Sequence, residues 1–217
     1  MLLGGLQKFT LIDYPGKIAC TVFTIGCNFN CPFCHNPELV DPELIKKQPK
    51  IPEKYFFEFL KKRKGDLEGV CITGGEPTCQ KDLPEFIKKI KKLGFAVKLD
   101  TNGSNPEMVK KLIDKKLLDY IAVDVKGLPI PEIAEMIKNS GIDCEFRMTV
   151  VPKLHSKKNI LEIAKNLAPA KKFFLQQFRP NKTLDPNFAK EKSYSRKELE
   201  EILESIRQFF DECGIRE

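Results

Sequence analysis

Short apolar runs alternate with amphipathic segments rich in lysine and glutamate along almost the whole chain, and this alternation restricts the fold more than any other feature. Each apolar run is nearly continuous, which is typical of parallel strands covered on both faces. The predicted strands are 19–25, 69–73, 96–100, 120–125, 145–151 and 173–177. The predicted helices are 53–64, 83–93, 106–116, 131–140, 157–167 and 195–213. These β-then-α units predict an α/β fold, either an open doubly wound sheet or an incomplete barrel of parallel strands.

Length and cysteine content limit the class of protein. A chain of 217 residues suits one domain, which we expect to cover 1–217. Its 8 cysteines are too few for a disulfide scaffold, and we expect a reducing cytoplasm. No basic region followed by an apolar core begins the chain, and the longest apolar runs are too short to span a bilayer. We therefore expect a soluble, cytoplasmic protein with no membrane partner.

The net charge of +7 bears on the partners. Most of the excess lysine and arginine falls on the exposed faces of predicted helices, where solvated charge is the ordinary explanation. No basic stripe is interleaved with stacking aromatic residues, so we expect no nucleic-acid partner. An acidic electron donor such as flavodoxin or ferredoxin would be attracted by a basic surface.

Cys27, Cys31 and Cys34, spaced C-x3-C-x2-C, are the strongest candidates for a metal site. A 4Fe-4S cluster normally takes four thiolates, so three ligands from one loop would leave one iron open to a ligand that is not protein. A zinc site that adds His35 is an alternative, although Cys34 and His35 are neighbours and reach one tetrahedral ion with difficulty. A dithiol redox pair of Cys31 and Cys34 is another, and it leaves Cys27 without a role.

Other distinctive residues directly follow the second and third predicted strands, where parallel α/β proteins carry their chemistry. Gly74 and Gly75 would let bare backbone approach a ligand, and Glu76 adds a carboxylate that accepts hydrogen bonds from an ammonium group. An ordinary glycine turn is the plain alternative. Asp100 stands at a strand tip, and the residues after it form a turn and a helix cap.

Charged residues also lie on the fourth and fifth predicted strands. Asp124 requires a partner if it is buried, and Lys126, two residues on and hence on the same side, is the predicted partner. A ligand site and a structural ion pair are both open for these two residues. Arg147, alone in an apolar strand, suggests anion binding or a salt bridge at the edge of the core. His155 is expected to be a surface-loop histidine.

The loop 26–36, GCNFNCPFCHN, resembles the cluster loop of the radical S-adenosylmethionine (SAM) enzymes. In that family the open iron is chelated by the amino and carboxylate groups of SAM. Gly74, Gly75 and Glu76 look like the family's GGE motif, which holds the amino group of SAM. An acid in the place of Asp100 points toward SAM in similar enzymes.

The resemblance implies further members of the site and a particular fold. In the activating-enzyme branch of the family, an Asp-x-Lys like Asp124 and Lys126 contacts the ribose and carboxylate of SAM. We also predict that the cofactor-binding site includes Phe33, His35, Asn102 and Arg147. The implied fold is a partial (β/α)6 TIM-type barrel, a radical SAM core at about 17–180, followed by a C-terminal helix at about 195–213.

Three further segments, 4–17, 34–40 and 98–104, look like the activating proteins of anaerobic ribonucleoside-triphosphate reductase. That resemblance implies a glycyl-radical enzyme as protein substrate, reduced flavodoxin or ferredoxin as electron donor, and no catalytic acid or base. Pyruvate formate-lyase activases share much of the pattern, and 7-carboxy-7-deazaguanine synthase is an alternative with a small-molecule substrate. An electron carrier or zinc-binding module is the non-enzyme alternative. No family motif matches 188–217.

Overall fold

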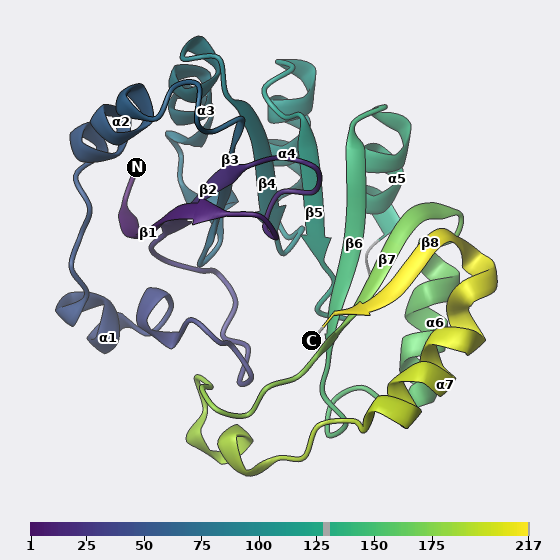
Figure 1. Ribbon diagram of the computed structural model, residues 1–217. Helices are drawn as coiled ribbons and strands as arrows, with labels where there is room; N and C mark the ends of the chain where they lie inside the picture. The colour runs from purple at the N-terminus through teal and green to yellow at the C-terminus, as the bar shows by residue number, and fades with distance from the viewer. Residues whose placement is uncertain (128–130, 217) are drawn as a thin grey trace. The chain divides into compact units, whose positions relative to one another are not determined.

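A computed structural model describes residues 1–127 and 131–216. The chain groups into two compact units, one of Met1–Asn30 with Asn36–Ile121 and one of Cys31–His35 with Ala122–Glu217. Figure 1 draws the first unit in purple to teal and the second mainly in green to yellow. The single domain expected from the length stays a prediction.

The first unit is built on strands that follow one another in chain order. Strand β1 (Leu3–Thr10) pairs antiparallel with β2 (Ala19–Thr24), and β2 pairs parallel with β3 (Gly69–Gly74). Strand β4 (Ala96–Thr101) pairs parallel with β3. The register aligns Ala19 with Gly69 and Gly69 with Ala96, so the loops after β2, β3 and β4 leave from the same end of the strands.

Helices of the first unit follow the strands. They are α1 (Pro42–Lys47), α2 (Glu53–Lys62), α3 (Leu83–Lys92) and α4 (Pro106–Asp114), with short 3-10 turns at Pro37–Leu39 and Pro77–Cys79. The apolar face of α3 is buried through Phe86, Ile87 and Ile90, while its lysines face outward. Asn105 caps α4 by accepting a hydrogen bond from the Met108 amide at 3.2 Å.

Strand β5 (Tyr120–Asp124) contains the boundary between the units. In the second unit β6 (Asp143–Val150), β7 (Ala170–Gln177) and β8 (Phe210–Arg216) pair in parallel in that order. Its helices are α5 (Pro131–Asn139), α6 (Lys157–Leu167) and α7 (Arg196–Ile206), with 3-10 turns at Pro186–Lys190 and Arg207–Phe209. Capping boxes at Ser156 and Ser195 begin α6 and α7.

The predicted alternation of strands and helices is confirmed, most boundaries lying within a few residues of the prediction. The prediction of one helix over 195–213 is wrong, because α7 ends at Ile206 and the chain continues into β8. Strand β1 was not predicted. No helix in the described part of the chain is long and apolar enough to cross a membrane.

Candidate functional site

In the first unit, the glycine pair after β3 packs directly on the backbone that leads into the cysteine loop. The Gly75 amide donates to the Thr24 carbonyl at 2.9 Å, and the Glu76 amide donates to the Gly26 carbonyl at 2.8 Å. A Cβ atom at Gly75 would fall 2.1 Å from the Gly26 carbonyl oxygen. Gly74 has φ of +120°, and a Cβ there would fall 2.3 Å from the Thr24 nitrogen. Only glycine permits this approach.

The Glu76 carboxylate fixes the loops after β3 and β4. Its Oε1 accepts from the Thr78 amide at 3.0 Å and from the hydroxyls of Thr78 and Thr101, both at 2.6 Å. Its Oε2 accepts from the Asn102 amide at 2.7 Å. The side chain is 1% exposed, and burial raises the pKa of Glu76 above its ordinary value while these hydrogen bonds act in the opposite direction. Glu76 therefore holds the two loops in register.

Asn102 brings the loop after β4 to the first cysteine. Its side-chain amide lies 4.0 Å from Cys27 Sγ and donates to the Asn28 side-chain oxygen at 3.1 Å. Asn28 in turn donates to the Ser104 hydroxyl at 2.7 Å. The Phe29 amide donates to Cys27 Sγ at 3.3 Å. Neither Asn28 nor Ser104 was singled out from the sequence, since polar loop residues carry no signal until their loops meet.

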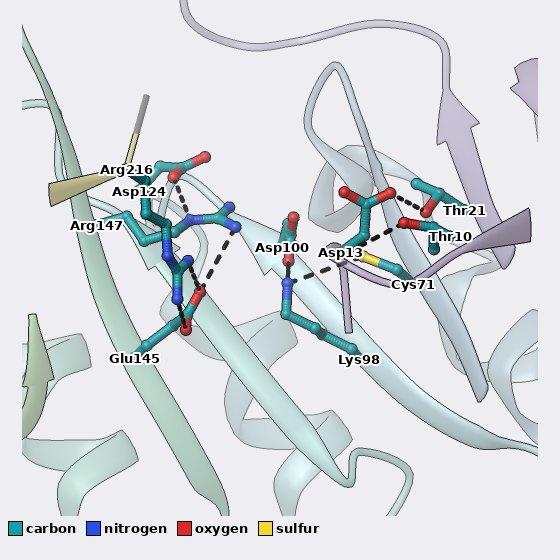
Figure 2. Close-up of polar contacts among 10 residues, drawn as sticks. All are labelled: Thr10, Asp13, Thr21, Cys71, Lys98, Asp100, Asp124, Glu145, Arg147 and Arg216. Atoms are coloured by element: carbon teal, nitrogen blue, oxygen red, sulfur yellow. Dashed lines mark hydrogen bonds and ion pairs between the residues drawn. The ribbon is translucent and has the colours of Figure 1, made fainter. Parts of the chain in front are cut away.

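Asp100 is paired with a buried lysine that the sequence did not reveal. Lys98 is 1% exposed and forms an ion pair with Asp100, as Figure 2 shows. The ammonium group also lies 3.9 Å from Cys71 Sγ and 5.8 Å from the centre of the Tyr120 ring. Because a buried ammonium needs a counter-charge, Lys98 holds Asp100 at the strand tip.

In the second unit, the residues Cys31 to His35 form a turn anchored by aromatic rings. The Cys34 amide donates to the Cys31 carbonyl at 3.0 Å. Phe33 is buried in an apolar cluster with Val151, Phe178 and Phe188, and Cys31 packs against that cluster. Burial raises the pKa of the Cys31 thiol above its ordinary value, and the charge of Lys126 partly opposes this.

The two histidines of the chain both contact this aromatic cluster. His35 stacks on Phe178 with 6.1 Å between ring centres, and its Nε2 lies 2.9 Å from the Arg179 carbonyl oxygen. The prediction of a surface-loop position for His155 is wrong, because its side chain is buried and its Nδ1 accepts from the Val151 amide at 3.1 Å. Burial lowers the pKa of each histidine, so both favour the neutral form.

A chain of alternating charges links β5, β6 and β8. Arg147 Nε donates to Asp124 at 2.9 Å, while Lys126 lies 3.9 Å from the same carboxylate. Arg147 also lies 3.7 Å from Glu145, and Glu145 is bound by both terminal nitrogens of Arg216 at 2.7 and 2.8 Å. Figure 2 shows these four side chains, Asp124, Arg147, Glu145 and Arg216, grouped together with dashed lines marking the contacts between them. The predicted Asp124–Lys126 pair is present, but Arg147 is the closer partner.

Glu145 and Arg216 were missed in the sequence. Glu145 carried a usable signal, because it is an acid between Cys144 and Phe146 in an apolar strand, the same argument that selected Asp124. Arg216 carried none, since its strand was not predicted.

The cysteine loop supplies three thiols, the donor set that a 4Fe-4S cluster with one open iron takes. Cys27, Cys31 and Cys34 are present as thiols and not as disulfides. His35, the fourth residue that a zinc site would add, has its Nε2 at the Arg179 carbonyl and its ring stacked on Phe178, so a metal would have to bind its Nδ1. Within residues 1–127 and 131–216, no three His, Cys, Asp or Glu side chains are already grouped for a metal ion. Cys27 belongs to the first unit and the other two cysteines to the second, so their joint ligation stays a prediction.

Comparisons with known proteins identify the family of the chain. The family model described as the radical SAM superfamily matches residues 21–160. A protein of Methanocaldococcus jannaschii, provisionally named a glycyl-radical enzyme activating enzyme, is 33% identical over 99% of this chain and 95% of its own. A pyruvate formate-lyase-activating enzyme of Clostridium pasteurianum is 32% identical over 74% of this chain and 73% of its own.

Solved structures show the same fold. SuiB of Streptococcus suis, solved with bound S-adenosylmethionine, matches with a TM-score of 0.65 and 18% identity over 89% of this chain. This chain spans 48% of SuiB, about half its length. The predicted fold class is thereby confirmed.

The chain belongs to the radical SAM superfamily, whose model covers most of it. Within that superfamily it belongs with the glycyl-radical enzyme activating enzymes, given its full-length likeness to the archaeal relative. The electron carrier and the zinc-binding module are therefore set aside as functions.

Proposed function

We propose that this protein is an activase that cleaves SAM reductively and transfers the radical to a glycine of a partner enzyme, anaerobic ribonucleoside-triphosphate reductase. The observation that carries the proposal is the contact between the cysteine loop and the glycine pair. The Gly26 carbonyl, next to Cys27, accepts from the Glu76 amide, and no side chain at Gly75 would fit. The loop that carries the predicted cluster ligands is thus fixed to the glycine turn that we propose binds SAM.

Cys27, Cys31 and Cys34 would hold the cluster and leave one iron for SAM. Bound there, the cluster and SAM would supply one-electron reductive chemistry, with reduced flavodoxin or ferredoxin as the electron source, that cleaves the bond between the sulfonium and the 5' carbon of SAM and removes a hydrogen atom from a glycine α-carbon of the partner enzyme. The protein contributes positioning, exclusion of water and tuning of the cofactor.

The strand-end residues have distinct proposed roles toward SAM. Gly74 and Gly75, which pack on the backbone of Thr24 and Gly26, would offer backbone carbonyls to its amino group, and Asp100, held by Lys98, would offer a carboxylate from the next strand. In the second unit, Asp124 and Lys126 would receive the ribose hydroxyls and the carboxylate. Lys126 lies 5.7 Å from the centre of the Phe33 ring, which limits its movement.

Two names among the relatives bear on the target. The archaeal relative is a provisional glycyl-radical enzyme activating enzyme, which supports a glycyl-radical enzyme as protein substrate. The clostridial relative activates pyruvate formate-lyase, which makes that enzyme the competing target. The segments 4–17 and 98–104 favour the reductase. Reduced flavodoxin or ferredoxin remains the proposed electron donor.

The target is tested by radical transfer to purified candidates. Anaerobically reconstituted protein, dithionite and SAM are mixed with anaerobic ribonucleoside-triphosphate reductase or with pyruvate formate-lyase, and the glycyl radical is detected by electron paramagnetic resonance. We expect the signal in the reductase alone. A signal confined to pyruvate formate-lyase would reassign the target, and SAM cleavage without a signal in either would reject a protein substrate of these two kinds.

A small-molecule reaction is the second candidate. A 7-carboxy-7-deazaguanine synthase of Thermococcus kodakarensis is 26% identical over 66% of this chain. Formation of 7-carboxy-7-deazaguanine in the absence of any partner protein would favour this function over the activase.

A further inference from the structure

Arg216, the last residue that the structure describes, makes the shortest ion pair among the charged side chains that link β5, β6 and β8. Arg216 binds Glu145 through two parallel hydrogen bonds of 2.7 and 2.8 Å, the geometry in which a guanidinium pairs most strongly with a carboxylate. Glu145 is 1% exposed, whereas the Arg216 side chain is 36% exposed. The buried acid therefore depends on an arginine that reaches it from the C-terminal strand.

The register explains how Arg216 reaches that acid. Arg216 on β8 pairs with Gln176 on β7, and Gln176 pairs with Thr149 on β6. The guanidinium carbon of Arg216 lies 3.7 Å from the centre of the Phe174 ring, two residues before Gln176 on β7. The side chain thus lies across β7 on an aromatic surface that fixes its direction.

Arg147 stands between two carboxylates that compete for it. It contacts Asp124 at 2.9 Å and Glu145 at the longer distance of 3.7 Å. Glu145 and Arg147 are two residues apart on β6 and share a face of the sheet. With Arg216 occupying both oxygens of Glu145, the short hydrogen bond of Arg147 goes to Asp124.

We propose that Arg216 is a positioning residue for SAM binding, because its pairing with Glu145 leaves Arg147 to hold Asp124 in its binding orientation. The proposal rests on the proposed function, in which Asp124 contacts SAM. It gives the C-terminal strand a part in the cofactor site. Loss of Arg216 leaves Glu145 to draw Arg147 away from Asp124, and neutralising Glu145 removes that pull.

The test is a double-mutant cycle on SAM affinity. Arg216→Gln, Glu145→Gln and the double variant are reconstituted anaerobically with iron and sulfide, and the Kd for SAM is measured by equilibrium dialysis. Arg216→Gln should weaken SAM binding by about tenfold, a coupling of the size seen between contacting residues. The double variant should return to within about twofold of the unsubstituted protein.

Three controls separate the positioning role of Arg216 from a purely structural effect and from failure of the proposed function. Arg207→Gln removes an arginine paired with exposed Glu204 in the same part of the chain and should leave the Kd unchanged. Thermal unfolding of every variant separates the two roles, because Glu145→Gln also removes the buried charge that Arg216→Gln strands. A merely structural role predicts that SAM affinity and Tm fall and recover together, whereas the positioning role predicts weaker SAM binding per folded, cluster-loaded protein. Asp124→Asn should itself weaken SAM binding.

The outcomes are distinct. A double variant as weak as Arg216→Gln, or an unchanged Kd in Arg216→Gln while Asp124→Asn binds weakly, would overturn the positioning role alone. An unchanged Kd in Asp124→Asn would overturn the role of Asp124 and this inference with it.

Discussion

Two buried glutamates, one in each unit, are satisfied in opposite ways. Glu76 accepts its hydrogen bonds from hydroxyls and backbone amides, all of them neutral. Glu145 is paired with the guanidinium groups of Arg216 and Arg147. Both are 1% exposed, so burial alone does not decide which solution is used.

The difference follows from what each glutamate holds. Glu76 joins two loops whose backbones are already close, so short neutral donors reach it. Glu145 sits within a strand, where backbone amides are committed to the sheet and only long side chains from the same sheet can reach it. The neutral donors around Glu76 fix the backbone of two loops. In the network of ion pairs around Glu145, loss of one charged partner alters the pairing of the others.

We expect the greatest loss of stability from a substitution at Gly75, which packs on the Gly26 carbonyl. Gly75→Ala should lower the free energy of unfolding by about 3 kcal/mol or more, because its Cβ would meet the Gly26 carbonyl, which is backbone and cannot move aside alone. Urea unfolding measures the loss. Gly214→Ala is the matched control, since its Cβ would find its nearest atoms in the Phe174 ring at an ordinary 3.6 Å. Equal stability of the two variants would contradict the close approach at Gly75.

The two glutamates can be compared directly by removing each carboxylate. Glu76→Ala strands buried donors on Thr101, Asn102 and Thr78 and should cost about 3 kcal/mol of unfolding free energy. Glu145→Ala should cost about 1 kcal/mol, because Arg216 is partly exposed and can turn to water while Arg147 keeps Asp124. Urea unfolding of both variants, side by side, checks the order. The reverse order would show that the charged network is the stronger anchor.

The smallest expected effect concerns pH. His155 Nδ1 accepts from the Val151 amide and so must be unprotonated, and burial together with the charge of Lys126 lowers its pKa below the ordinary 6.5. The unfolded chain then binds a proton that the folded chain excludes. Stability from this group should be complete above pH 6.5 and decline as pH falls toward the folded pKa.

The matched variant for that measurement is His155→Gln, which keeps an acceptor oxygen and cannot titrate. The difference in unfolding free energy between the two proteins, followed from pH 8 to pH 5, removes the contribution of His35, whose pKa shift has the same sign. A difference independent of pH would exclude His155 as a titrating group.

The sequence predicted the repeating strands and helices because their apolar periodicity is local. Strand β1 was not predicted, because it contains two glycines and its middle residues, such as Gln7 and Lys8, are exposed. Strand β8 was not predicted, because Asp211 and Glu212 continue the polar pattern of the helix before it. Only its pairing with β7 makes this segment a strand.

The candidate site was predictable where chemistry and strand ends coincide in the sequence. The cysteines, the glycine pair, Asp100 and Asp124 were all selected in this way, and their roles toward a ligand stay predictions. The partners that hold them were not, because Glu145 and Arg216 are 71 residues apart and meet only through the sheet. Lys98 likewise shows its burial only in three dimensions, where Asp100 supplies its counter-charge.

Reductive cleavage of SAM by the protein that carries this cysteine loop can be measured directly. The direct measurement is 5'-deoxyadenosine released from SAM by the anaerobically reconstituted, dithionite-reduced protein, quantified by liquid chromatography beside Cys31→Ala and Cys213→Ala. We predict product from the unsubstituted protein and from Cys213→Ala, and none from Cys31→Ala. Absence of 5'-deoxyadenosine from protein with a fully loaded cluster would contradict the proposed cleavage of SAM.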